Sequence, residues 1–296
     1  MPNRIAIDMG GTKTEIMLTE NDPFKIIERK RVPTNREKGY SYILENLANL
    51  ILAYRNKCQT APLIGMGIPG TISPKTGLVR NANTTCLIGK PLKTDLEKRI
   101  GLPVYIENDA NCFALSEALY GAGKGYENVM GIIMGTGMGG GLILSGKLWG
   151  GRQGIAGEFG HSSINFNGLK CWCGQKGCLE MYLSGPAIEE NYKNISGQKL
   201  SVEEIYGRYT SQESAAETAM NDLLDHFSRG MANLIACFDP DIIVIGGGVS
   251  NLPILYTEGV RRTSQRIFSD SMDTPIVKNQ LGDSSGIFGA ALLADN

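Results

Sequence analysis

The sequence lacks an excess of charge of either sign, which limits the partners that it can attract. Its 296 residues contain 29 Lys and Arg against 30 Asp and Glu, a formal net charge of -1. Without a strongly basic surface, binding of nucleic acid or of an acidic membrane is not expected. Apolar stretches are also too short to match the about eighteen residues of a membrane span, and MPNRIAID shows no signal-peptide pattern. We expect a cytoplasmic protein that handles small molecules.

Cysteine and histidine are both scarce, and their placement is uneven. There are seven cysteines, an odd number, and two histidines. Four cysteines stand among apolar neighbours, where buried thiols usually occur: Cys58, Cys86, Cys112 and Cys237. A disulfide framework is therefore not expected. The other three cysteines lie close together, in a segment that also holds one of the two histidines.

Glycine, in contrast, is abundant and clustered. The 38 glycines gather in IDMGGTKT, GIPGT, GTGMGGG, GGRQGIAGEFG and VIGGGVS, each beside an apolar or β-branched run. This pattern is typical of strands that end in loops whose backbone approaches a ligand closely.

The predicted elements repeat along the chain. IAIDMG, EIMLTE and FKIIERKRVPT are expected strands, followed by a helix over 41–55, the strands LIGMGIPG and PVYIEND, and the helix ANCFALSEALYG. The hairpin restarts at VMGIIMGTGMGGGLILSGKL, and a long helix, the strand DIIVIGGG and the helix SSGIFGAALLAD follow. Two hairpin-first α/β units predict a duplicated fold with two lobes around a cleft. We expect lobes at 1–120 and 121–284, with the helix at about 285–296 packing back on the first.

Glycine turns at three strand ends are candidate phosphate sites. GTGMGG matches G-x-G-x-x-G, but a strand rather than a helix follows it, so a Rossmann dinucleotide site is excluded. A turn between strands can still offer backbone N–H groups to phosphate oxygens, and Thr12 and Lys13 add side-chain donors to IDMGGTK. Each turn alone fits an ordinary hairpin equally well. Together with Gly246, Gly247 and Gly248, the turns favour a nucleotide.

Two acidic positions stand at predicted strand ends. Asp8 precedes the first glycine pair, where it could hold Mg²⁺ on a polyphosphate through water, or could simply stabilise the turn. Asn108 and Asp109 lie at a strand-to-helix junction, where α/β sheets bind ligands. Asp109 could cap the helix that follows, or it could accept the proton of an attacking hydroxyl, as an acid does in phosphoryl transfer.

The cysteine-rich segment offers the ligand set of a closed structural zinc site. The set is His161, Cys171, Cys173 and Cys178. A single residue between two cysteines is unusual for a zinc finger, so reduced thiols without a metal remain the alternative. Glu158 and Glu180 flank the set, and a metal would fix both carboxylates in space. Taken alone, each glutamate would be a surface charge.

These segments together resemble one family. AIDMGGTKTEI, GMGIPGTISPKTG, ENDANCFALSEA, IMGTGMGGGLI, GEFGH, CWCGQKGCLE, DPDIIVIGGG and GDSSGIFGAA are similar to the successive signatures of the repressor, open reading frame and kinase (ROK) family of sugar kinases. The resemblance covers essentially the whole chain, and GEFGH followed by C-x-C-G-x-x-G-C-x-E is its most specific part. It implies an α/β, actin-like fold of the hexokinase type (ribonuclease H-like), ATP with Mg²⁺, a hexose substrate, structural zinc and a homodimer.

The resemblance also implies roles for individual residues. Asp109 would be the general base. Sugar would be bound by Asn83, Asn108, Asp109, Glu158, His161 and Glu180. Zinc would be held by His161, Cys171, Cys173 and Cys178, so that the two ring nitrogens of the histidine serve metal and sugar separately. ATP would be bound by Asp8, Gly10, Gly11, Thr12, Lys13, Gly135, Thr136, Gly137, Gly139, Gly140, Gly141, Gly246, Gly247 and Gly248.

The motifs do not agree on one sugar. TISPKTGLVRNANTTCLIGKPL is similar to fructose and mannose kinases, whereas ENDANCFALSEA and CLEMYLSG are closer to N-acetylglucosamine kinases. We expect fructose, with mannose or glucose as further substrates and N-acetylglucosamine as the alternative. The family also contains repressors with an added N-terminal helix-turn-helix. Because the first strand starts by Arg4, DNA binding is not expected, and Asp109 argues against a non-catalytic sugar sensor.

Overall fold

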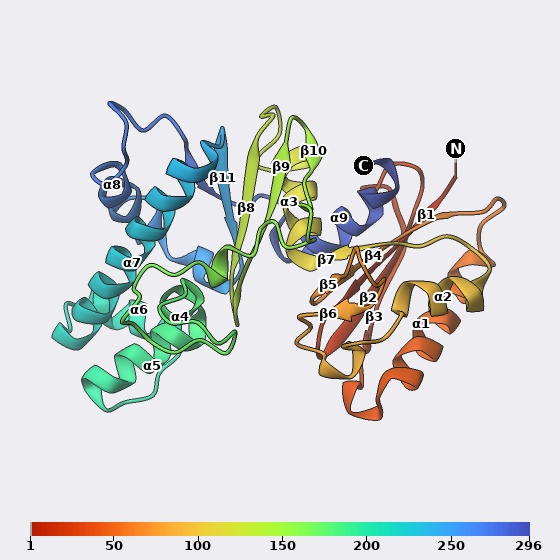
Figure 1. Ribbon diagram of the computed structural model, residues 1–296, viewed down its shortest axis with the longest axis horizontal. Helices are drawn as coiled ribbons and strands as arrows, with labels where there is room; N and C mark the ends of the chain where they lie inside the picture. The colour runs from red at the N-terminus through yellow and green to blue at the C-terminus, as the bar shows by residue number, and fades with distance from the viewer. Residues whose placement is uncertain (1) are drawn as a thin grey trace.

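The first of two five-stranded sheets is built from the N-terminal part of the chain (Figure 1). The computed structural model describes residues 2–296. The strands, in the order β3-β2-β1-β4-β7, are β1 (Arg4–Met9), β2 (Lys13–Thr19), β3 (Ile26–Pro33), β4 (Leu63–Ile68) and β7 (Tyr105–Asn108). β1, β4 and β7 are parallel, and β2 and β3 continue the sheet antiparallel. The carboxyl ends of the three parallel strands therefore share one edge, which carries Asp8 and Asn108.

The second sheet repeats this arrangement. Its strands, in the order β10-β9-β8-β11-β12, are β8 (Val129–Met134), β9 (Met138–Leu144), β10 (Lys147–Leu148), β11 (Ile242–Gly246) and β12 (Ile276–Lys278). β8 pairs antiparallel with β9 and parallel with β11, as β1 does with β2 and β4. The duplicated, hairpin-first α/β fold expected from the sequence is confirmed. A separate small hairpin is formed by β5 (Thr71–Ile72) and β6 (Val79–Arg80).

Burial explains the strand sequences. β4 and β11 lie inside their sheets and read as continuous apolar runs, LIGMGI and IIVIG, because helices or the opposite layer cover both faces. β3, with the sequence IIERKRVP, is the edge of the first sheet and is largely exposed. Its charged side chains discourage pairing with another chain.

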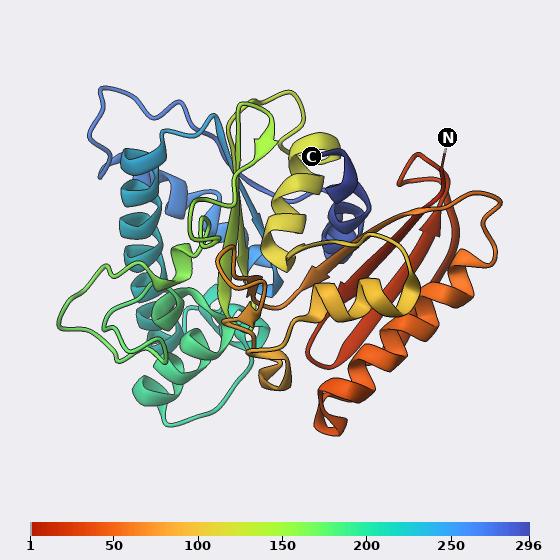
Figure 2. The same ribbon diagram turned by 45° about the vertical axis from the view of Figure 1, so that its right-hand side comes forward.

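Helices cover the outer face of each sheet and fill the space between the sheets (Figure 2). They are α1 (Tyr40–Arg55), α2 (Leu92–Ile100), α3 (Asp109–Tyr120), α4 (Glu180–Leu183), α5 (Gly185–Ser196), α6 (Val202–Thr210), α7 (Ser214–Phe238), α8 (Glu258–Ser264) and α9 (Ser285–Leu292). The apolar sides of α1 and α2 complete the core of the first sheet. α5, α6 and α7 share a core with the second sheet.

The middle layer consists of α3 and α9, and each of these helices packs on the sheet formed by the other half of the chain. α9 packs on β1 and β4, whereas α3 packs on β8 and β9 and against α9. The approach is close, because a Cβ on Gly289 would lie 1.8 Å from the carbonyl oxygen of Cys112, and one on Gly65 would lie 1.8 Å from that of Ala290. The last helix thus returns to the first sheet, while α3 contacts the second. We propose the lobe boundaries 1–120 and 121–284 on this basis, with α3 as the shared element.

A buried glutamate joins the ends of these two helices. Glu117, near the end of α3, has no exposed surface. Its carboxyl oxygens accept hydrogen bonds from the backbone N–H groups of Ala122 (3.0 Å), Gln280 (3.0 Å) and Leu281 (2.9 Å) and from the hydroxyl of Ser285 (2.8 Å). One side chain therefore fixes both the segment between the sheets and the start of α9.

The helices offer no candidate for a membrane span. Within residues 2–296, none is both long and apolar enough to cross a bilayer.

Candidate functional site

Asn108, rather than Asp109, caps α3. The side-chain oxygen of Asn108 accepts hydrogen bonds from the N–H groups of Ala110 (2.9 Å) and Asn111 (3.3 Å), and its amide donates to the carbonyl of Gly70 (3.1 Å). Asp109 is the first residue of the helix, so its predicted alternative as the cap is wrong. Among the hydrogen bonds of the described residues, Asp109 accepts one on Oδ1, from Ala110 N–H (2.8 Å), and none on Oδ2. That second oxygen is available to a ligand.

The surroundings of Asp109 favour its protonated form. Burial raises the pKa of this carboxyl group to about 7, and the charges of Asp8 and Glu158 act in the same direction, while the N–H of Ala110 opposes them. Asp109 nevertheless keeps part of its surface open to solvent. A carboxyl group with a pKa near neutrality is well matched to removing a proton from a hydroxyl.

Asp8 lies at the end of β1, on the same edge of the sheet as Asp109. It is paired across the strands with Glu15, which is in turn opposite Arg31. Burial first and Glu15 second raise the pKa of Asp8 to about 6, against the lowering effect of Arg31 and Arg29. The start of α9 comes so close that a Cβ on Gly286 would lie 2.8 Å from Asp8 Oδ2.

Each of the three predicted glycine turns lies at the end of a strand, although Gly246 itself is the last residue of β11 and is buried. The first is closed by a hydrogen bond from Gly10 N–H to the carbonyl of Lys13 (2.9 Å), and it leaves the Thr12 and Lys13 side chains exposed. The second spans Gly135, Thr136 and Gly137 between β8 and β9.

The third turn lies beside the second. A Cβ on Gly247, whose φ is +83°, would be 2.3 Å from the carbonyl of Met134, and both Gly247 and Gly248 are exposed. Across the molecule, the hydroxyl of Thr84 is fully buried, has no hydrogen-bond partner among the described residues, and lies near Gly11. Each of the three turns has exposed residues that phosphate oxygens could approach, whereas the hydroxyl of Thr84 is too deeply buried for such a contact.

Gly139, Gly140 and Gly141 lie within β9 rather than in the turn. A Cβ on Gly141 would be 2.7 Å from Asn111 Oδ1, and one on Gly140 would be 2.5 Å from the ring of Phe159. Their lack of side chains therefore already has a packing reason, since it lets α3 and the turn at 159–161 approach the strand. Their expected part in ATP binding stays a prediction.

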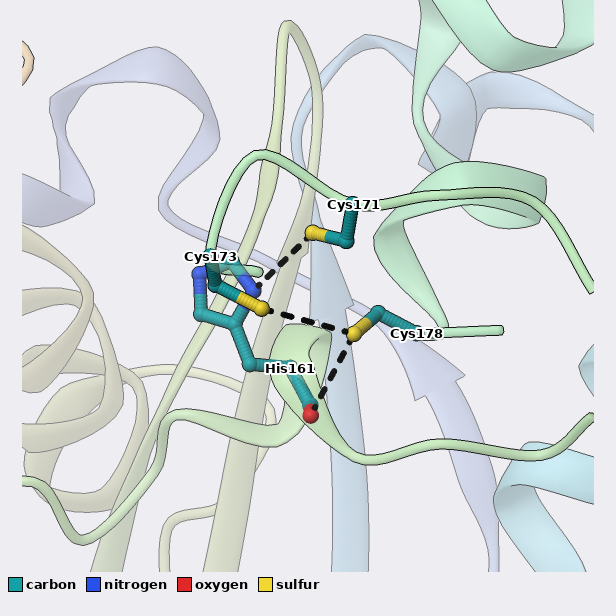
Figure 3. A group of neighbouring side chains, drawn as sticks. All are labelled: His161, Cys171, Cys173 and Cys178. Atoms are coloured by element: carbon teal, nitrogen blue, oxygen red, sulfur yellow. Dashed lines mark hydrogen bonds between the residues drawn. The ribbon is translucent and has the colours of Figure 1, made fainter. Parts of the chain in front are cut away.

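The predicted metal ligands converge on one point (Figure 3). The ligand atoms of His161, Cys171, Cys173 and Cys178 all lie within 4.8 Å of one another. His161 Nδ1 is 3.6 Å from the sulfur of Cys171, and the sulfurs of Cys173 and Cys178 are 3.7 Å apart. The cysteines are free, and 3.7 Å is far beyond the length of a disulfide bond.

These separations fit a tetrahedral zinc ion. Zn–S bonds of about 2.3 Å and a Zn–N bond of about 2.0 Å place two sulfurs about 3.8 Å apart and a nitrogen about 3.5 Å from a sulfur. Both values agree with these two measured separations, and the other pairs of ligand atoms lie within 4.8 Å. Because Nδ1 of His161 faces the sulfurs, Nε2 is left for another partner.

Removal of the metal provides a direct test of this set. We expect Cys173→Ala, or treatment with a chelator, to lower the melting temperature and to weaken sugar binding together, because the ion would order the whole 161–178 segment. Zinc content, thermal unfolding and the KM for sugar are the measurements. Cys237→Ala removes an exposed thiol outside the cluster and serves as the control. A protein that is fully active and stable without any metal would contradict the assignment.

Glu158 and Glu180 lie next to the metal set. Burial raises the pKa of Glu158. The charges of His161 and Arg80 lower this pKa, and the charge of Glu180 raises it. Glu180 Oε2 accepts a hydrogen bond from Met138 N–H (2.9 Å), directly after the second glycine turn. The predicted sugar ligands Glu158, His161 and Glu180 are therefore neighbours.

Two residues beside these ligands were not predicted from the sequence. The positive charge of Arg80, on β6, lowers the pKa of Glu158, and its guanidinium group donates a hydrogen bond to the carbonyl of Gln153. The hydroxyl of Thr71, in the same hairpin, donates a hydrogen bond to the carbonyl of Gly154 (3.0 Å). The hairpin thus reaches the loop that precedes Glu158. Trp172, between two of the cysteines, donates to Glu180 (2.6 Å). Its place in the C-x-C motif was the available signal, whereas nothing in the sequence marked Arg80.

Asn83 is the predicted sugar ligand with the least structural context. It is exposed, and no hydrogen bond joins its side chain to the rest of the described chain. Its neighbour Ala82 packs against Gly70, the residue whose carbonyl binds Asn108. Asn83 therefore stands near the end of β7, and its role stays a prediction.

Comparison with known proteins extends these observations. The model of the ROK family matches residues 4–296. The chain belongs to the ROK family. It is 38% identical to the N-acetyl-D-glucosamine kinase of Vibrio atlanticus (strain LGP32), over 97% of each protein.

Solved structures of ROK proteins have the same fold. The ROK hexokinase from Thermus thermophilus is 30% identical, with a TM-score of 0.87, over 98% of this chain and 97% of that one. A ROK glucokinase from Streptomyces griseus, in complex with glucose and AMPPNP, is also 30% identical, with a TM-score of 0.79 and 98% coverage of both chains. The actin-like fold implied by the sequence motifs is confirmed for this ROK protein.

Proposed function

We propose that this ROK protein is an ATP-dependent hexose kinase that transfers the γ-phosphoryl group of ATP to the C6 hydroxyl of N-acetylglucosamine. The observation that carries the proposal is the position of Asp109. This residue has one carboxyl oxygen without a protein partner, a pKa raised to about 7, and a place on the same edge of the sheet as Asp8. Few structural roles require a partly solvent-exposed carboxyl group with a raised pKa at the edge of a sheet.

The choice of sugar follows the relatives. The Vibrio atlanticus protein, similar over nearly its whole length, is an N-acetyl-D-glucosamine kinase. This likeness supports the alternative sugar over the fructose preference expected from the 71–92 segment. A cytoplasmic location and a homodimer stay predictions from the family resemblance.

The proposed reaction uses residues from both halves of the fold. Bound Mg²⁺ would neutralise charge on the ATP phosphates, and Asp8 is placed to hold it through water. Thr12, Lys13 and the backbone of the three glycine turns would bind the nucleotide. Asn108, Glu158, His161 and Glu180 would orient the hexose. Asp109 then removes the proton of the C6 hydroxyl as its oxygen attacks the γ-phosphorus, and the bond to ADP breaks.

The zinc set has a positioning role in this proposal. Sugar hydroxyls are recognised only if several donors and acceptors are held within a fraction of an ångström. His161 is itself a ligand, and Glu180 lies two residues after Cys178. Fixing four points of an irregular segment therefore also fixes the groups that contact the sugar.

A panel of free sugars tests the function. We expect ATP-dependent phosphorylation of N-acetylglucosamine with a kcat/KM at least about tenfold higher than for fructose, mannose or glucose, since a hydrogen bond to a charged side chain contributes about that factor or more. Coupled detection of ADP and mass spectrometry of the product would measure it. Preferential phosphorylation of fructose would restore the sequence-based choice. Sugar binding without ADP release would instead favour a non-catalytic sensor.

A further inference from the structure

Trp172 occupies an unusual position for a large aromatic residue. It is the single residue between the zinc-set cysteines Cys171 and Cys173, and 65% of its surface is exposed. Exposure alone would be unremarkable on a protein surface. However, within the described part of the chain Trp172 makes one side-chain hydrogen bond and one ring–ring contact, and each is with a proposed sugar ligand.

The first contact is a short hydrogen bond. The indole Nε1–H of Trp172 donates to Glu180 Oε1 at 2.6 Å. The other oxygen, Oε2, accepts from Met138 N–H at 2.9 Å, and a Cβ on Gly137 would lie 2.7 Å from it. Two donors from separate segments thus set the direction of one carboxyl group. Each oxygen retains further lone pairs for a sugar hydroxyl.

The second contact is with the histidine. The ring of Trp172 meets that of His161 edge-on, with centroids 4.8 Å apart and an interplanar angle of 88°. His161 Nδ1 faces the sulfur of Cys171, which leaves Nε2 of the same ring for the sugar. The indole of Trp172 packs against this ring. The indole therefore limits the orientations open to both proposed sugar ligands.

We infer that Trp172 is a positioning residue of the sugar site, which acts by holding Glu180 in the orientation that accepts a sugar hydroxyl. The inference rests on the proposed function. It does not require the indole to react or to contact the phosphates. Its consequence is selective: loss of the N–H should impair sugar binding, while chemistry and nucleotide binding continue.

The conservative variant Trp172→Phe tests the hydrogen bond. It keeps an aromatic ring beside His161 and removes the donor to Glu180. We expect the KM for N-acetylglucosamine to rise about tenfold, the usual effect of losing a hydrogen bond to a charged group. The KM for ATP and kcat should change by less than about twofold. Trp149→Phe, which alters an exposed tryptophan outside the zinc segment, should match the wild type. An unchanged sugar KM in Trp172→Phe would overturn the inference.

A double-mutant cycle separates positioning from a merely structural role. Glu180→Ala removes the acceptor of the indole N–H, so if Trp172 acts through Glu180, adding Trp172→Phe to Glu180→Ala should raise the sugar KM by less than about a further twofold. Independent, multiplicative effects would refute this route. Zinc content is measured in every variant, so that loss of the metal is recognised directly.

A binding measurement leaves Trp172 itself unchanged. The chain has two tryptophans, so Trp149→Phe makes Trp172 the sole indole reporter. Adding N-acetylglucosamine without ATP should alter its fluorescence emission, and an unaltered emission at saturating sugar would count against the inference. The two proposals can be rejected separately. Absence of sugar phosphorylation in the wild type would reject the proposed function. An active wild type in which Trp172 fluorescence does not respond to sugar and Trp172→Phe leaves the sugar KM unchanged would reject only the positioning role.

Discussion

Asp109→Asn should lower kcat for sugar phosphorylation by at least about 10², the usual range for loss of a general base. Asparagine has nearly the same shape as aspartate, and its side-chain oxygen can still accept the hydrogen bond from Ala110 N–H. Asn108 continues to cap α3. The variant should therefore fold and bind sugar normally, and steady-state kinetics together with sugar titration would show the separation.

The pH profile gives this prediction a second measurement. The base must be deprotonated to act, and the pKa of Asp109 is raised to about 7. In the wild type, kcat/KM should therefore rise with pH and be half-maximal near that value, whereas the residual activity of Asp109→Asn should lack this step. Turnover close to that of the wild type would remove Asp109 from the catalytic role.

Glu117→Ala should reduce the free energy of unfolding by about 3–5 kcal/mol, because several buried donors lose their acceptor at once and each costs about 1–3 kcal/mol when unpaired. These donors are the N–H groups of Ala122, Gln280 and Leu281 and the hydroxyl of Ser285. A cavity replaces the removed side chain and adds to the loss. Urea and thermal unfolding would measure the change.

Glu97→Ala is the matched control for this loss. Glu97 also accepts a backbone hydrogen bond, from Val104 N–H (2.9 Å), and pairs with Lys93 (3.0 Å), but its side chain is 30% exposed. Water can replace the missing acceptor there, so the cost should be about 1 kcal/mol. Equal losses in the two variants would show that the carboxyl group of Glu117 does not have the special importance that its burial indicates.

The fold could be predicted from local patterns because strands and glycine turns carry strong signals. IAIDMG and DIIVIGGG became β1 and β11 with little adjustment, and the 41–55 helix became α1. The repeated hairpin was visible because each glycine turn separates two apolar runs. The clustering of His161, Cys171, Cys173 and Cys178 could also be predicted, since the four residues lie within eighteen positions of the sequence, while zinc binding by them stays a prediction.

Contacts between distant segments were beyond the reach of these patterns. Asn108 and Asp109 are both suitable caps, and only the backbone geometry of Asn108 decided between them. In the sequence, Glu117 is the lone acidic residue after the first turn of an apolar helix, and its partners Gln280, Leu281 and Ser285 lie more than 160 positions later. Arg80 gave no signal for the same reason. The exchange of α3 and α9 between the sheets likewise depends on packing that spans most of the chain.

The packing of α9 on β1 and β4 has a consequence for folding during synthesis on the ribosome. Synthesis delivers the N-terminal sheet long before the helix that shields its inner face, where Ala6 and Met17 are buried. Until α9 has been synthesised, that apolar surface has no lasting cover, and the nascent chain is exposed to aggregation. Loss of α9 by premature termination would leave the inner face of the first sheet without its cover, although every residue of the proposed catalytic centre had already been made.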